Sequence, residues 1–163
     1  MLSLVAYTDG GCRGNPGPGG WGFVLIDPRE GNALERAGGL PHTTNNQMEL
    51  TAAIEALTTL KRDAKVLLHT DSLYVLKSAT QWLPGWKARG WRRKEGPLLN
   101  VELLQRLDAL IAQHEVEWRW VRGHSGDLGN EHVDRLANEA MDRLARNQPV
   151  AHERRFMWPT PVR

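Results

Sequence analysis

Short stretches in which hydrophobic residues alternate with smaller or polar ones, or run together, predict five β-strands. Three of them, over residues 5–9, 21–26 and 33–39, are joined by short turns and predict an antiparallel meander. The other two, residues 65–71 and 116–121, each follow a segment with helical periodicity. A strand reached through a helix is expected to run parallel to its partner. The pattern therefore predicts one mixed sheet of five strands.

Hydrophobic residues three and four positions apart predict helices over residues 44–60, 73–79, 101–111 and 130–144. Thr44 and Gln47 are spaced as an N-terminal capping box before the first of these helices. With helices on both faces of the sheet, the chain is predicted to have an α/β fold. We expect residues 1–145 to form a single domain and residues 146–163, which are rich in proline and arginine, to form a C-terminal tail.

The composition of the 163 residues, 40% hydrophobic and 25% charged, is ordinary for a soluble globular protein. No hydrophobic run approaches the ~20 residues that cross a membrane, so no membrane association is expected. The first strand begins so near Met1 that we expect no signal peptide. Cys12 is the only cysteine, which fits a reducing compartment. We therefore expect a cytoplasmic protein, and nothing in the sequence suggests an obligate oligomer.

Positive charge is concentrated in one segment of the chain. Residues 77–95 carry a net charge of +5, which leaves −3 for the rest of a chain whose net charge is +2. Three of the seven tryptophans lie among these basic residues, and this interleaving is typical of nucleic-acid binding. The alternative is a solvated basic surface. Three other tryptophans are expected in the core, namely Trp21, Trp118 and Trp120.

Two predicted strands end in the same dipeptide, Thr8-Asp9 and Thr70-Asp71. A lone Asp before glycine is more often a turn cap, but two strands that end alike would place two carboxylates at one edge of the sheet. Glu49 adjoins the buried face of the first long helix. On the last helix Asp134 shares a face with Asn130, although for Asp134 alone a solvated surface position is equally plausible.

Four converging carboxylates would repel one another unless cations lay among them. Oxygen ligands without a thiolate or histidine set favour hard divalent ions. Two such ions about 4 Å apart would activate a water molecule and stabilise the leaving oxygen of a phosphodiester. The expected cofactor is Mg²⁺, for which Mn²⁺ can substitute.

The sequence resembles the type 1 ribonucleases H from residue 2 to about residue 144. The matching motifs are Tyr7-Thr8-Asp9-Gly10, Gly14-Asn15-Pro16-Gly17, the stretch from Thr43 to Leu50, Thr70-Asp71-Ser72, the segment from Gln81-Trp82 to Gly90-Trp91, Val121-Arg122-Gly123-His124, and Asn130-Glu131 through Asp134. The resemblance implies hydrolysis of the RNA strand of an RNA–DNA hybrid by an endonuclease, leaving 3′-hydroxyl and 5′-phosphate ends.

The resemblance also implies roles for individual residues. The metal-binding acids would be Asp9, Glu49, Asp71 and Asp134, supported by Asn130, and His124 would be the mobile-loop histidine that assists proton transfer or product release. Candidate contacts to the hybrid are Cys12 (through the backbone near it), Asn15, Thr44, Asn45, Asn46, Asn100, Tyr74, Trp82 and Trp86. The family's basic protrusion would span about residues 80–97, with Lys87, Arg89, Arg92, Arg93 and Lys94. One of Asn45 and Asn46 could instead cap a helix.

One position departs from the family pattern: Leu73 stands where many members carry a glutamine that touches a base or sugar edge. We expect weaker hybrid binding from this change, because leucine can neither donate nor accept a hydrogen bond. Two alternatives to the hybrid ribonuclease are a non-catalytic hybrid-binding module of the same fold and another two-metal nuclease, such as an exonuclease or an integrase-type enzyme.

Overall fold

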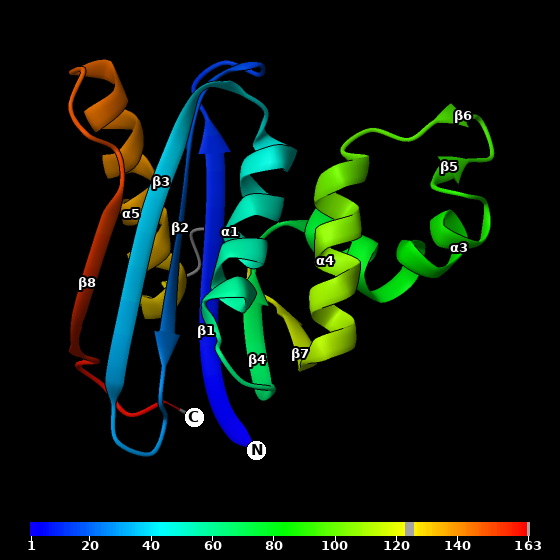
Figure 1. The fold of residues 1–163 in the computed structure, drawn as a ribbon. Helices are drawn as coiled ribbons and strands as arrows, with labels where there is room; N and C mark the ends of the chain where they lie inside the picture. The colour runs from blue at the N-terminus through cyan, green and yellow to red at the C-terminus, as the bar shows by residue number, and fades with distance from the viewer. Residues whose placement is uncertain (123–125, 163) are drawn as a thin grey trace.

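Six strands form one mixed sheet in the computed structural model, which describes residues 1–122 and 126–162 (Figure 1). In the order β7-β4-β1-β2-β3-β8 they are β7 (Glu115–Trp120), β4 (Ala64–Thr70), β1 (Leu2–Cys12), β2 (Gly17–Ile26), β3 (Asn32–Thr43) and β8 (His152–Met157). The meander β1-β2-β3 is antiparallel, and β4 runs parallel to both β1 and β7. The predicted α/β class and mixed sheet are therefore confirmed.

Helices cover both faces of this sheet (Figure 1). Helices α1 (Asn45–Thr59) and α4 (Val101–Gln113) lie on one side and α5 (Leu128–Ala145) on the other. The Thr44 hydroxyl accepts a hydrogen bond from the Gln47 backbone N–H (3.2 Å), as a capping residue should. The Gln47 side chain does not complete the capping box, because it contacts Thr43 and Asn100 instead.

The prediction of five strands was wrong by one, because β8 comes from the segment assigned to the C-terminal tail. Residues 152–157 pair antiparallel with residues 32–37 of β3. The residues of β8 that contact the rest of the sheet include two polar ones, His152 and Arg154, which form hydrogen bonds to a buried glutamate. The strand therefore lacks the hydrophobic alternation by which strands are recognised in a sequence.

A close approach of backbones sets the spacing between the sheet and α1. A Cβ atom at Gly10 would overlap the backbone of Met48 and Glu49. Only glycine lets β1 pass this close to the first turn of α1. The end of β1, which carries Asp9, is thereby held beside the turn that carries Glu49.

The segment after β4 leaves the sheet and projects beyond α4 (Figure 1). It consists of α2 (Leu73–Lys77), a π-helical turn η1 (Ser78–Trp82), α3 (Leu83–Ala88) and a small hairpin of β5 (Arg92–Arg93) and β6 (Gly96–Pro97). The basic segment expected at residues 80–97 is thus a protrusion from the body of the molecule.

The expectation for Trp120 was wrong, since 44% of this residue is exposed. It lies at the end of β7, an edge strand, whereas Trp21 and Trp118 pack partly buried against the core. None of the described helices combines the length and the hydrophobicity that crossing a bilayer requires.

Candidate active site

Three of the four predicted acids converge at one edge of the sheet. Carboxylate oxygens of Asp9, Glu49 and Asp71 lie within 4.8 Å of one another. Strands β1 and β4 are parallel, with Thr8 beside Thr70, so the aspartates that follow these residues are at the same level of the sheet. Glu49 reaches them from the first turns of α1. The acids of the two Thr-Asp strand ends and the acid beside the buried face of α1 therefore lie together at one site.

Burial and mutual repulsion shift the ionisation of these acids. Burial raises the pKa of Asp9 to about 8, with further contributions from the charges of Asp71 and Asp134, against a hydrogen bond from the Gly10 N–H (2.9 Å). Burial and the charges of Asp9 and Asp71 raise the pKa of Glu49 well above its usual value. Within the described residues, the buried Oε1 atom of Glu49 has no hydrogen-bond partner. Such a cluster favours a bound proton or a bound cation.

Asp134 is on α5 and lies outside the group of three carboxylates, although its charge is close enough to help raise the pKa of Asp9. The start of α5 is well fixed, because Asp127 caps the helix by accepting a hydrogen bond from the Asn130 backbone N–H (2.9 Å). Asn130 is buried. The predicted His124 lies outside the described residues.

The Gly-rich turn after β1 packs against the start of α1. The Asn15 side-chain oxygen accepts a hydrogen bond from the Asn45 N–H (3.1 Å), and the Cys12 thiol donates to the carbonyls of Gly17 and Thr43. Because Thr44 caps α1, Asn45 and Asn46 are not needed as caps, and both are exposed.

Asn100 connects α1 to the protruding segment. It precedes α4 in the left-handed conformation (φ 63°), and its side chain does not cap that helix. Its amide nitrogen donates to the Tyr74 hydroxyl (3.2 Å), and its amide oxygen accepts from the Gln47 side chain (3.3 Å). Thr44 and Asn100, two of the candidate contacts to the hybrid, are thereby joined through a single residue, Gln47.

The protrusion holds an aromatic groove next to basic side chains. The Trp82 ring lies 5.5 Å from Trp86 and 6.4 Å from Tyr74, measured between centroids. The three rings and the basic side chains of Arg89, Arg93 and Lys94 line a cavity of about 440 Å³. Arg92 is exposed at the start of the hairpin, and Lys87 pairs with Asp108 (3.1 Å). Leu73, 49% exposed, is the first residue of α2.

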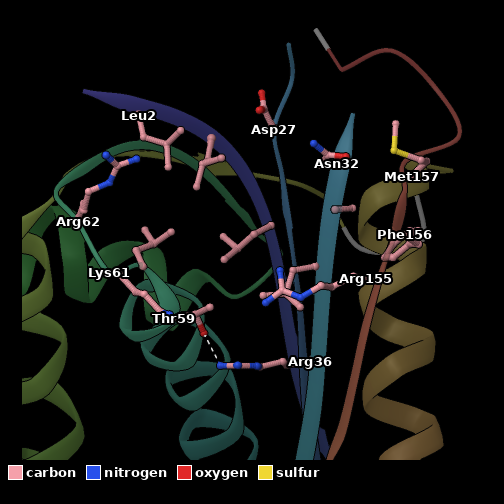
Figure 2. A pocket seen from close by; sticks show the side chains of 15 residues that line it. Leu2, Asp27, Asn32, Arg36, Thr59, Lys61, Arg62, Arg155, Phe156 and Met157 are labelled. Carbon is pink, nitrogen blue, oxygen red and sulfur yellow. Dashed lines mark hydrogen bonds between the residues drawn. The ribbon is translucent and has the colours of Figure 1, made fainter. Parts of the chain in front are cut away.

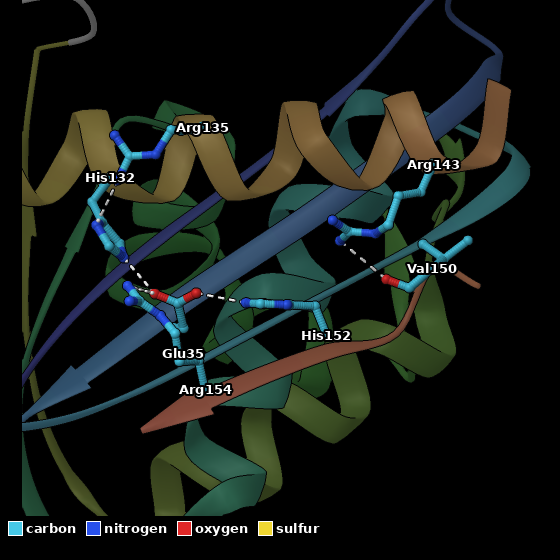
Figure 3. Close-up of polar contacts among 7 residues, drawn as sticks. All are labelled: Glu35, His132, Arg135, Arg143, Val150, His152 and Arg154. Atoms are coloured by element: carbon cyan, nitrogen blue, oxygen red, sulfur yellow. Dashed lines mark hydrogen bonds and ion pairs between the residues drawn. The ribbon is translucent and has the colours of Figure 1, made fainter. Parts of the chain in front are cut away.

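A second polar cluster, which we did not predict, surrounds Glu35 of β3, between α5 and the outer strand β8 (Figure 3). This buried carboxylate is hydrogen-bonded to His132 of α5 and to His152 and Arg154 of β8. A sequence signal did exist. Glu35 is two residues from both Ala33 and Ala37, so its side chain points to the same, buried face of the predicted strand as theirs.

A cavity of about 910 Å³ opens far from the carboxylates, between the start of β1, the turn after β2 and the end of β8 (Figure 2). Its floor is largely hydrophobic, and its rim includes Arg36, Lys61, Arg62 and Arg155. Because β1 enters this region at Leu2 and carries Asp9 at its other end, the cavity does not belong to the carboxylate site.

Comparisons with known proteins agree with this geometry. The RNase H family model matches residues 2–142. Ribonuclease H of Albidiferax ferrireducens is 56% identical over 140 residues, which cover 84% of this chain and 93% of the relative. The crystal structure of LC9-RNase H1, a type 1 RNase H, superposes with a TM-score of 0.79 at 36% identity and covers 87% of this chain and 73% of that one.

A second solved structure is LC11-RNase H1 in complex with an RNA/DNA hybrid. It is similar with a TM-score of 0.62 at 27% identity, covering 87% of this chain and 99% of that one. The match to the family model, the high identity over most of both chains and the shared fold lead to one conclusion: this chain belongs to the type 1 ribonuclease H family.

Proposed function

We propose that this chain is an endoribonuclease that hydrolyses the RNA strand of RNA–DNA hybrids with Mg²⁺, for which Mn²⁺ can substitute. The observation that carries the proposal is the group of three carboxylates around the buried Asp9, with ligand atoms within 4.8 Å of one another and a buried Glu49 oxygen that has no described protein partner. The hybrid bound to the related LC11-RNase H1 supports the choice of substrate.

The residues present fit a divalent cation. Asp9, Glu49 and Asp71 would hold it, with Asp134 contributing from α5, and all four supply the oxygen ligands that Mg²⁺ prefers. When bound, such ions lower the pKa of a water molecule and neutralise charge that develops on a phosphodiester. Asn130, buried in the first turn of α5, would support Asp134.

The residues around the site would distinguish the two strands of a hybrid. The turn near Cys12 and the Asn15–Asn45 pair present small polar groups suited to 2′-hydroxyls in a shallow minor groove. Asn46 is exposed beside them. Thr44 and Asn100, bridged by Gln47, would receive a phosphate of the DNA strand.

The protrusion would extend this DNA contact. Tyr74, Trp82 and Trp86 offer apolar ring faces, and five basic side chains accompany them, namely Lys87, Arg89, Arg92, Arg93 and Lys94. His124 would assist proton transfer or product release. Leu73 is exposed close to Asp71 and would give the hybrid an apolar contact in place of a hydrogen bond.

We also propose that the enzyme is a cytoplasmic monomer with a free thiol. The single cysteine, Cys12, is unpaired and hydrogen-bonded within the turn after β1. Light scattering after size exclusion would test the oligomeric state, and cell fractionation would test the location.

The test is cleavage of end-labelled substrates with and without Mg²⁺. The panel contains an RNA–DNA hybrid, duplex RNA, duplex DNA and single-stranded RNA. Asp9→Asn and Asp71→Asn serve as inactive variants, and Asp63→Asn, which changes an exposed acid away from the site, is the matched control.

We expect metal-dependent cleavage of the hybrid's RNA alone, by the wild type and by Asp63→Asn but not by the two site variants. Binding of the hybrid without cleavage under Mg²⁺ or Mn²⁺ would refute the enzymatic proposal and favour a binding module. Cleavage of duplex DNA would instead favour another two-metal nuclease.

A further inference from the structure

The cluster formed by Glu35, His132, His152 and Arg154, here called the Glu35 cluster, ties three elements together (Figure 3). The Oε1 atom of Glu35 is 2.9 Å from His132 Nε2 and 3.1 Å from an Arg154 nitrogen, and Oε2 is 2.6 Å from His152 Nε2. Glu35 is only 2% exposed. Both oxygens of a buried carboxylate in β3 are thus bonded, from α5 on one side and from β8 on the other.

The orientation of His132 is determined by its two partners. A guanidinium can only donate, so Arg135, 3.1 Å from His132 Nδ1, leaves that nitrogen as an acceptor. The proton of the neutral ring is then on Nε2, which donates to Glu35. The ring also stacks on Phe156 (5.5 Å between centroids) and meets Trp158 edge-on (5.2 Å). His132 therefore fixes the rotation of α5 relative to β3 and β8.

Close contacts of three glycines define how close α5 lies to the sheet. A Cβ at Gly129 would overlap the Tyr7 ring, one at Gly22 the Leu136 side chain, and one at Gly20 the Ala137 carbonyl oxygen. The hydrogen bond from His132 to Glu35 adds a directional constraint near the start of the helix. It acts two residues before Asp134, the acid that lies outside the group of three carboxylates.

We propose that Glu35 is a positioning residue for the metal site, acting through His132 and α5 to place Asp134 beside Asp9, Glu49 and Asp71. This proposal rests on the metal-dependent function proposed above. A side chain extends about 5–6 Å from a helix axis, so a rotation of α5 by about 10° would move the Asp134 carboxylate by about 1 Å. A displacement of this size can lower activity by about 10²-fold.

The test compares Glu35→Ala and Glu35→Gln with Leu107→Ala, a core variant in α4 that is far from α5 and also destabilising. Direct binding of Mn²⁺ is measured by calorimetry, and hybrid cleavage is measured as a function of Mn²⁺ concentration, well below each unfolding temperature. Asp134→Asn is the reference for loss of the fourth acid.

We expect Glu35→Ala to weaken Mn²⁺ binding about 10–100-fold, the range for losing a partner that orients metal ligands, with the KM for the hybrid unchanged. Glu35→Gln keeps an acceptor for the His132 hydrogen bond and should weaken Mn²⁺ binding less. Leu107→Ala should bind Mn²⁺ like the wild type. If Glu35→Ala does not fold, the test uses Glu35→Gln, which must then weaken Mn²⁺ binding more than Leu107→Ala does.

Equal Mn²⁺ affinity in the Glu35 variants and Leu107→Ala would overturn the positioning role. So would a raised KM for the hybrid with unchanged metal binding. The two proposals can fail separately. A wild-type protein that binds Mn²⁺ but cuts no hybrid refutes the proposed function. Active Glu35 variants whose Mn²⁺ binding and whose dependence of cleavage on Mn²⁺ concentration are unchanged refute only the positioning role.

Discussion

Replacing Asp9 by asparagine is expected to stabilise the metal-free protein while it abolishes cleavage. In the folded chain the pKa of Asp9 is raised to about 8, by burial first and then by the neighbouring charges of Asp71 and Asp134, from an ordinary value of 3.8. At pH 7 the folded state therefore holds a proton that the unfolded chain has released. Asparagine is neutral in both states and removes this penalty.

The magnitude follows from the linkage between proton binding and folding. About three pH units separate 3.8 from pH 7, and at about 1.4 kcal/mol per unit the penalty is about 4 kcal/mol. Because the neighbouring acids share the repulsion, we expect a gain of about 2–4 kcal/mol. For a chain of this size that corresponds to a rise in the melting temperature of about 5–15 °C.

The sign of the pH dependence is specific to a raised carboxyl pKa. Below 3.8 Asp9 is protonated in both states, so Asp9→Asn should gain nothing there. The gain should grow between pH 4 and 8 and level off above pH 8. Thermal unfolding in EDTA at pH 4, 7 and 8.5 measures it, with Asp63→Asn as an exposed control that should change stability by less than about 0.5 kcal/mol. A gain that is absent at pH 7, or equally large at pH 4, would refute the reasoning.

Four further predictions concern the metal, the Glu35 cluster and the surroundings of the site. A cation must displace the proton that Asp9 holds up to about pH 8, so the affinity for Mn²⁺ should rise up to about tenfold per pH unit between pH 6 and 8. Calorimetry should show that protons are released on binding. A Mn²⁺ affinity that does not change with pH would contradict this. Burial would raise the pKa of Glu35, but hydrogen bonds from Arg154 and the two histidines lower it, so its stabilising effect is complete above about pH 4.5 and lost as pH falls through the lowered value. Glu35→Gln should therefore lose about 3 kcal/mol in urea unfolding at pH 7 and progressively less as the pH falls below 4.5, and a loss that does not change with pH would argue against an ionised cluster. Gly10→Ala should cost about 1–3 kcal/mol and lower the cleavage rate about 10²-fold by separating β1 from α1; near-normal cleavage would show that the approach is not needed. Leu73→Gln should tighten hybrid binding by about 1 kcal/mol in a fluorescence titration, and an unchanged Kd would count against a hydrogen bond at this position.

The main features of the site follow from local patterns. Asp9 and Asp71 could be paired because each ends a strand, and parallel strands bring their carboxyl ends to the same edge. Glu49 could be added because its neighbours define the buried stripe of α1. The position of Asp134 depends on the packing of α5, which no local pattern specifies, and the structure places it beside Asp9 but outside the group of three.

What the sequence did not predict depends on contacts between distant residues. Strand β8 was missed because His152 and Arg154 are polar, and they meet the sheet only because Glu35, more than a hundred residues earlier, accepts their hydrogen bonds. Trp120 was misplaced because an alternating pattern does not tell an edge strand from a central one. In each case the tertiary partner determines the burial of the residue.

Strand β8 also determines what the outer edge of the sheet presents to other molecules. Without it, residues 32–37 of β3 would expose a row of unpaired backbone donors and acceptors, a template on which another chain can add a strand and begin to aggregate. With β8 in place, the outermost strand carries Glu153, Arg154 and Arg155 instead. Charged residues discourage strand addition. The same segment that completes the Glu35 cluster therefore also replaces the open edge of β3 with a charged outer strand.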